Sequence, residues 1–133
     1  MTKFESKKVI VNASCQVVYE FMADFSNFEK LLPQEVSNWK VDGDSCSFKI
    51  EGIGDLSMRI ASKKPCSQIN IVSDGSNPVD YNLDCYFYSY DKDRCEVELI
   101  FDAELTAFME MVAANPLQNF VDMLADKIKE LFE

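Results

Sequence analysis

The chain has 133 residues, a length typical of one domain, and its 47% apolar and 27% charged residues indicate a globular protein and not a disordered one. Its net charge is −10, and residues 51–133 carry −9 of that total. A surface this negative repels phosphate backbones and anionic headgroups, so we expect neither nucleic acid nor an acidic membrane as a partner.

The chain contains no histidine, which is the commonest general base and the commonest zinc ligand. Catalytic systems that pair Ser or Cys with His therefore cannot be formed within it. We expect no metal site and no cofactor, and we assign no catalytic residue.

The five cysteines are an odd number without CxxC spacing, which indicates reduced thiols in a cytoplasmic protein. Residues 1–8 lack the apolar segment of a secretory signal. No stretch approaches 18 apolar residues, so we do not expect an integral membrane protein.

The first third of the chain predicts one strand and two short helices. Residues 3–12 read as a strand, and Ser14 is a natural N-cap for a helix over 15–23. Ser26 and Glu29 have the spacing of a capping box for a second helix, which we expect to end before Pro33.

From residue 36 the apolar residues alternate with polar ones, which is typical of strands that cover a core with one face. Turn signals at 42–44, 52–55, 74–78 and 91–94 divide this region into strands of an antiparallel sheet. Tyr86, Tyr88 and Tyr90 fall on the face we take to be outside, which suggests a contact surface and leaves a homodimer open.

The end of the chain predicts a long helix. Asn115 is a good N-cap, Pro116 suits the first helical position, and apolar residues recur three and four apart as far as Leu131. We expect residues 108–112 to form a turn or a separate short helix before it.

These elements predict an α+β fold in which a curved antiparallel sheet of about seven strands wraps around the C-terminal helix. Seven strands span about 33 Å, whereas one helix is only about 10 Å wide. The sheet must therefore curl around the helix, and curling leaves space that either side chains or a cavity occupies.

In the order of these elements the whole chain, 1–133, resembles a single domain of the START-like or SRPBCC superfamily, which has the helix-grip fold. It looks closest to bacterial members described as polyketide cyclase/dehydrase-like. The features that carry the resemblance are Ser14, the segments 21–25 and 28–33, the turn Gly52-Ile53-Gly54, and Asn115-Pro116-Leu117. The resemblance implies a hydrophobic cavity between sheet and helix, which members use for lipids, sterols, polyketides or plant hormones. Some members are cyclases, but the superfamily has no universal catalytic motif.

The candidate cavity wall consists of apolar residues on the expected inner face, and a filled core is the alternative reading of the same residues. They are Phe48, Ile50, Met58, Ile60, Ile71, Phe87, Leu99, Phe101, Leu105, Phe108, Met111, Leu117, Phe120, Val121 and Leu124. Possible polar anchors are Ser62, Ser73, Cys85, Ser89 and Arg59. Our strand register points Arg59 outward, and a shift of one residue would bring it inside.

Three functions are compatible with this sequence. The first is binding or transport of an apolar or amphipathic small molecule or lipid. The second is a scaffold or interaction protein, and the third is a cyclase or dehydratase acting on a polyketide-like substrate. The third function requires an ionisable group inside the cavity, for which Arg59, Asp55 and Tyr81 are the candidates.

Overall fold

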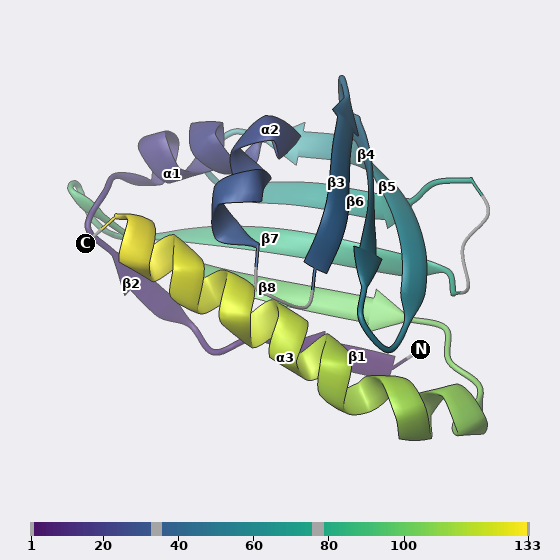
Figure 1. Cartoon of the computed structure of the whole chain (residues 1–133). Helices are drawn as coiled ribbons and strands as arrows, with labels where there is room; N and C mark the ends of the chain where they lie inside the picture. The colour runs from purple at the N-terminus through teal and green to yellow at the C-terminus, as the bar shows by residue number, and fades with distance from the viewer. Residues whose placement is uncertain (1, 33–35, 76–78, 133) are drawn as a thin grey trace.

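The computed structural model describes residues 2–32, 36–75 and 79–132. The first half of this chain contains two strands, two helices, a 3₁₀ turn and two further strands (Figure 1): β1 (Thr2–Glu5), β2 (Val9–Val11), α1 (Cys15–Met22), α2 (Phe25–Phe28), η1 (Glu29–Leu31), β3 (Val36–Asp42) and β4 (Ser45–Ile50). The second half contains four strands and the long helix: β5 (Gly54–Lys64), β6 (Gln68–Ser73), β7 (Tyr81–Asp91), β8 (Arg94–Ala103) and α3 (Ala107–Leu131).

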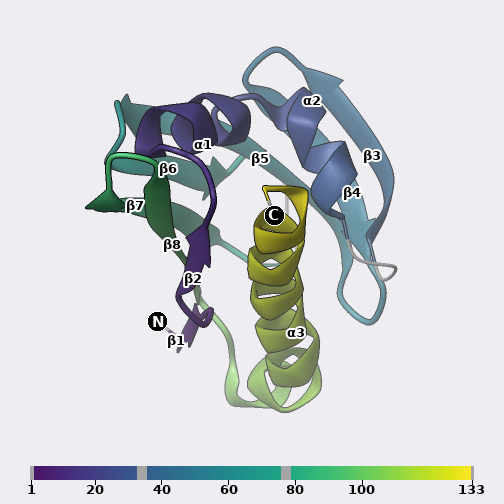
Figure 2. The same ribbon diagram turned by 90° about the vertical axis from the view of Figure 1, so that its left-hand side faces the viewer.

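The eight strands form one antiparallel sheet in the order β1-β8-β7-β6-β5-β4-β3, and β2 also pairs with β8. Figure 2 shows the sheet curling around α3, with α1 and α2 between its upper ends. The predicted helix-grip architecture is therefore confirmed, with eight strands in place of about seven.

The additional strand arises because the first strand is interrupted at Ser6. The pairing with β8 shifts by one residue between Glu5 and Val9. At the break, the Ser6 N–H donates to the Leu99 carbonyl (2.8 Å), and the Leu99 N–H donates to Ser6 Oγ (2.9 Å). The hydroxyl replaces a backbone acceptor, so the edge bends without leaving a buried amide unpaired.

The two short helices begin where side chains satisfy their first amides. Ser14 Oγ accepts the Val17 N–H, as predicted. The N-cap of α2 is Asp24 and not Ser26: its carboxylate accepts the Ser26 N–H at 2.9 Å. The prediction was wrong because a carboxylate two residues earlier is an equally good cap. Pro33 and part of the turn 74–78 lie outside the described residues.

The long helix begins at Ala107, nine residues before Pro116, so the predicted start at Asn115 is wrong. Thr106 is the N-cap, and its Oγ accepts the Met109 N–H at 3.2 Å. Proline lacks only its own N–H, and the helix continues through Pro116 without that one hydrogen bond. The segment we read as a lead-in is therefore the first two turns of α3.

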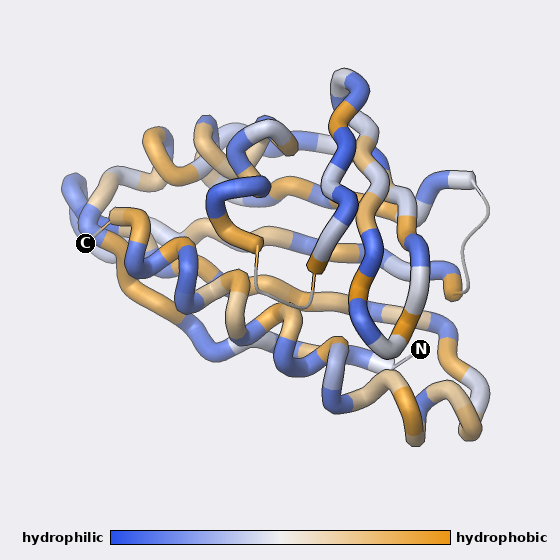
Figure 3. The backbone as a smooth tube through the Cα atoms, viewed as in Figure 1, coloured by the Kyte–Doolittle hydropathy of each residue, from blue (hydrophilic) through white to orange (hydrophobic). Residues whose placement is uncertain are grey.

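Aromatic rings cross the interior between sheet and helix, where aliphatic side chains make up the rest of the core. Five rings form a continuous row across it: Tyr81 stacks on Phe101 (centroids 4.9 Å apart), Phe101 meets Phe120 (6.3 Å), Phe120 stacks on Phe48 (6.2 Å), and Phe48 contacts Trp39 (5.2 Å). In Figure 3 the hydrophobic segments alternate with hydrophilic ones along the strands that carry these rings. Most of the space that curling creates is thus occupied by side chains.

Candidate ligand-binding pocket

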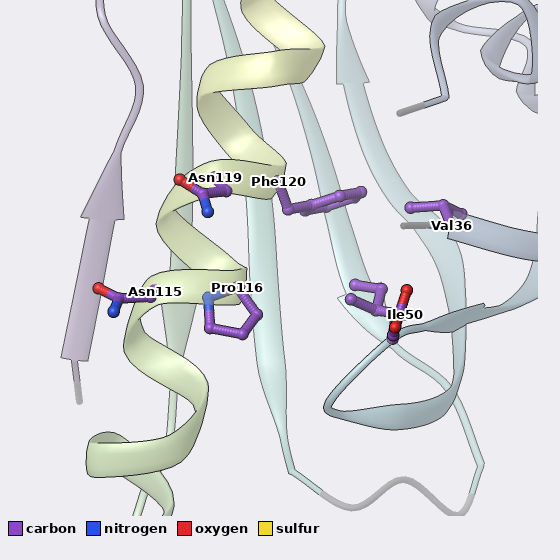
Figure 4. Close-up of a pocket in the computed structure, with 7 residues that line it drawn as sticks. Val36, Ile50, Asn115, Pro116, Asn119 and Phe120 are labelled. Carbon is purple, nitrogen blue, oxygen red and sulfur yellow. The ribbon is translucent and has the colours of Figure 1, made fainter. Parts of the chain in front are cut away.

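A pocket of about 380 Å³ lies where the β3–β4 edge of the sheet faces the middle of α3. Figure 4 shows Pro116 and Phe120 projecting from successive turns of α3 toward Val36 and Ile50. Glu51, Asn115 and Asn119 complete its lining. The pocket therefore has an apolar floor and a small number of polar groups, which is the usual composition of a small-molecule site.

The turn between β4 and β5 positions one wall of the pocket. The Ile53 N–H donates to the Ile50 carbonyl at 3.0 Å, which closes the turn. Gly52 has φ +89°, a conformation that side-chain-bearing residues rarely adopt. A Cβ on Gly52 would lie 3.7 Å from Pro116 Cγ, so this turn reaches the helix at the pocket.

A bulge in β3 explains why the filled interior ends beside the pocket. The pairing of β3 with β4 shifts between Ser37 and Lys40, and Asn38 has φ +57°. This shift turns Trp39 toward the interior, where its Nε1–H donates to the Phe25 carbonyl (3.1 Å) and its ring stacks on Phe28. Val36, before the bulge, is left as the residue of β3 that lines the pocket.

Only two of the fifteen predicted cavity residues, Ile50 and Phe120, line this pocket. Ile60 and Leu105 are half-buried. The remaining buried members belong to the core: Phe48, Met58, Ile71, Phe87, Leu99, Phe101, Leu117, Val121 and Leu124.

Phe108 and Met111 do not face the interior, so their predicted placement was wrong. They are 72% and 84% exposed. The reason is the early start of α3: its first two turns extend past the end of the sheet (Figure 1), where no strand covers them.

The predicted polar anchors are not gathered in the pocket. Ser62 is exposed because a bulge between Ile60 and Ser62 reverses the alternation of β5. Ser89 is exposed near the end of β7, where its Oγ donates to the Asp91 carbonyl. Ser73 Oγ accepts the Tyr81 N–H (3.2 Å), and Cys85 is fully buried in the core.

Arg59 points outward, as our register predicted. Its side chain is 51% exposed and lies 3.8 Å from the Asp74 carboxylate. Asp55 is exposed. Tyr81 is buried, but its hydroxyl donates to the Ser57 carbonyl (3.1 Å), and burial raises the pKa of the phenol. None of these three candidates for the ionisable group of the enzyme hypothesis lines the pocket, and the carboxylate that does line it, that of Glu51, is exposed.

The sequence interpretation missed five lining residues: Val36, Glu51, Asn115, Pro116 and Asn119. A usable signal was present, because Asn115 and Asn119 are four apart and directly precede Pro116 and Phe120, which are also four apart. Such adjacent polar and apolar pairs mark the border of the buried face of a helix.

A second hollow, of about 390 Å³, lies among β3, β4 and β5. Polar side chains dominate its lining, including Asn38, Lys40, Ser47 and Asp55. It lacks the apolar floor of the first pocket. Among the described residues, no His, Cys, Asp and Glu side chains are grouped in a way that could hold a metal ion.

The outer tyrosines are placed as the alternation predicts. Tyr86 and Tyr88 stack with their centroids 6.4 Å apart, and the Arg94 guanidinium lies over Tyr90, 4.7 Å from its centroid. A homodimer formed through this face stays a prediction.

No protein-family model matches this sequence, and no curated protein is similar to it. The structure, however, is similar to solved proteins over almost its whole length. Norcoclaurine synthase from Thalictrum flavum has a TM-score of 0.77 at 12% identity, over 98% of this chain and 85% of that one. The chain has the helix-grip fold.

Two bacterial proteins are also similar to this chain over almost its whole length. A START superfamily protein from Mycobacterium smegmatis has a TM-score of 0.71 at 14% identity, over 97% of this chain and 98% of that one. An aromatase/cyclase from Streptomyces sp. R1128 has a TM-score of 0.65 at 15% identity, over 98% and 95%. The resemblance predicted from the order of elements is therefore confirmed at the level of the fold. No helix in the described ranges is long and apolar enough to cross a membrane.

Proposed function

We propose that this protein binds an apolar or amphipathic small molecule in the pocket between the β4–β5 turn and α3. The observation that carries the proposal is the pocket of about 380 Å³ with an apolar floor of Val36, Ile50, Pro116 and Phe120. A volume in the range of drug-sized ligands, together with a few polar groups, is typical of such sites.

The polar part of the lining defines which ligands fit best. Figure 4 shows the Asn115 and Asn119 side chains on the side of α3 away from Val36 and Ile50, so that the Glu51 carboxylate is the polar group of the facing wall. A carboxylate accepts hydrogen bonds and does not donate them. Because the chain as a whole carries −10, a neutral or cationic ligand enters more readily than an anionic one. We therefore favour a neutral or cationic ligand with a hydrogen-bond donor, such as a hydroxyl or an amine, near one end.

The fold supports this proposal by analogy only. A norcoclaurine synthase and an aromatase/cyclase have the same fold and act on organic molecules, as their names state. A shared fold does not transfer chemistry, and function depends on the site. The proposal is therefore limited to binding.

Native mass spectrometry of protein purified without detergent, followed by organic extraction, tests whether a ligand is retained. Titration with N-phenyl-1-naphthylamine, an uncharged fluorescent probe of apolar sites, tests the pocket directly. We expect saturable fluorescence from one site. A bare mass together with no saturable fluorescence would contradict the proposal.

A substitution that fills the pocket tests whether the probe binds there. Val36→Trp adds an indole to a side chain that points into the pocket, and we expect it to weaken probe binding at least tenfold. Val41→Trp makes the same change on the same strand, at a position that is 37% exposed and outside the pocket. If both variants lose binding equally, the probe does not bind specifically in this pocket.

A further inference from the structure

Three cysteines from separate parts of the chain lie at the same end of the sheet, beneath α1. Cys15 is the first residue of α1, Cys66 lies in the turn between β5 and β6, and Cys95 is in β8. The sheet register places Cys95 opposite Val11, only four residues before Cys15. Figure 2 shows α1 lying across the ends of β6, β7 and β8.

Hydrogen bonds and ring contacts fix this arrangement. Cys66 has φ +59°, and the carbonyl of the next residue, Ser67, accepts the Phe87 N–H at 2.9 Å. The Tyr19 ring meets Phe87 edge-on, with centroids 6.0 Å apart, which holds α1 over β7. The turn that carries Cys66 is thus attached to the strand beside β8.

Cys15 lies close to Cys95, because Val11 pairs with Cys95 and because α1, which begins at Cys15, packs against β8. Cys95 is fully buried, whereas Cys15 and Cys66 are half-buried. Burial, and then the contact with Cys15, raise the pKa of the Cys95 thiol. Cys15 is therefore the member of the pair that a small oxidant in solvent reaches first.

We propose that Cys15 and Cys95 form a redox pair that a peroxide converts into a reversible disulfide. In the first step the Cys15 thiolate attacks the peroxide, an S–O bond forms, the O–O bond breaks, and hydroxide or water leaves. In the second step the Cys95 sulfur attacks the sulfur of the sulfenic acid, an S–S bond forms and the S–O bond breaks, and the departing hydroxide takes the proton of the Cys95 thiol and leaves as water. Two thiols are oxidised and one peroxide is reduced.

The disulfide would join the start of α1 to β8, at the end of the sheet remote from the β4–β5 turn. It would close a loop of most of the chain, and cross-links over long loops restrict the unfolded ensemble strongly. Oxidation is therefore expected to raise the denaturant concentration at which the protein unfolds. The proposal does not depend on a ligand in the pocket.

The sequence allows the pair to be identified without ambiguity. Trypsin cleaves after Lys8, Lys30, Arg94 and Lys127, so that the peptides 9–30 and 95–127 each contain one cysteine, Cys15 and Cys95 respectively. After treatment of the folded protein with hydrogen peroxide, we expect a loss of two hydrogens in the intact mass. We also expect a linked pair of these two peptides that a thiol reductant separates.

Cys15→Ser and Cys95→Ser should each abolish the loss of two hydrogens, and Cys95→Ser should leave Cys15 open to further oxidation. Cys46→Ser and Cys85→Ser are matched controls, since both cysteines are buried outside this cluster, and both variants should still form the link. Cys95→Ala provides a second variant if the buried hydroxyl prevents folding. No link, or a link from either cysteine to Cys66 in place of the Cys15–Cys95 pair, would overturn the proposal.

Discussion

The two halves of α3 differ in how many of their apolar side chains are buried. The C-terminal half, taken as residues 117–131, buries Leu117, Val121, Leu124 and Ile128 in the core. The N-terminal half, residues 107–116, buries only Ala113 and leaves Phe108, Met111 and Val112 exposed. The candidate pocket lies at the border between the two halves.

The same border divides the interior. On one side the aromatic row from Tyr81 to Trp39 fills the space that the curled sheet creates. On the other side, past Phe120, Pro116 and the β4–β5 turn leave the pocket open. The difference teaches that curvature alone does not create a cavity: a cavity remains only where the side chains stop filling the space.

The largest change in the free energy of unfolding should come from a substitution in the aromatic row. Phe101 is buried and contacts both Tyr81 and Phe120. We expect Phe101→Ala to lower the free energy of unfolding by about 4 kcal/mol, because it removes buried area and leaves a cavity. Phe108→Ala, in the exposed half of α3, should change it by no more than about 0.5 kcal/mol. Chemical denaturation measures both, and similar losses would contradict the division of the helix.

A second effect should appear at alkaline pH. Burial raises the pKa of Cys85 to about 12 and that of Cys46 also to about 12, from 9.0. The folded state keeps these thiols protonated, so their contribution is fully present below pH 9 and is lost as the pH rises from 9 toward 12. At pH 10.5 each thiol should have cost about 2 kcal/mol of stability.

Unfolding by denaturant at pH 8 and pH 10.5 measures this loss. Cys85→Ala should reduce the difference between the two pH values, whereas Cys66→Ala, which alters a half-buried thiol, serves as its control. If Cys85→Ala shows the same loss between the two pH values as the unaltered protein, the account of Cys85 is wrong.

The smallest effect tests where α3 begins. Thr106→Ala removes the hydroxyl that accepts the Met109 N–H and should lower the free energy of unfolding by about 1 kcal/mol. Asn115→Ala lies inside the helix and should change it by less than about 0.5 kcal/mol. Thermal or chemical unfolding measures both losses. A larger loss for Asn115→Ala than for Thr106→Ala would mean that the helix begins at Asn115.

The fold could be predicted because alternation and helical spacing report the buried faces directly. The alternation after the turn signal at 91–94 anticipated β8, and Ser14 anticipated the start of α1. Three features depended on choices between near-equal local signals: the break at Ser6, the cap at Asp24 and the start at Thr106. In each of them a side chain replaced a backbone partner, and spacing alone does not reveal this.

The pocket was less predictable than the fold. Inner-face residues such as Phe48 and Phe101 were identified correctly as interior, but alternation does not distinguish a residue that fills the core from one that borders a hollow. The bulge that turns Trp39 inward depends on the left-handed conformation of Asn38. That conformation decides which residues of β3 remain at the pocket, and no periodicity encodes it.

The central claim is that the border between the two halves of α3 is a binding site. The most direct test is a titration of isotopically labelled protein with N-phenyl-1-naphthylamine, followed by backbone amide NMR spectra. We expect the largest shifts at Val36, Ile50, Glu51, Asn119 and Phe120, with little change at Tyr86 and Tyr88 on the outer face. Shifts concentrated on the exposed face of Phe108 and Met111 or on the outer tyrosines, with none at the pocket, would contradict the account.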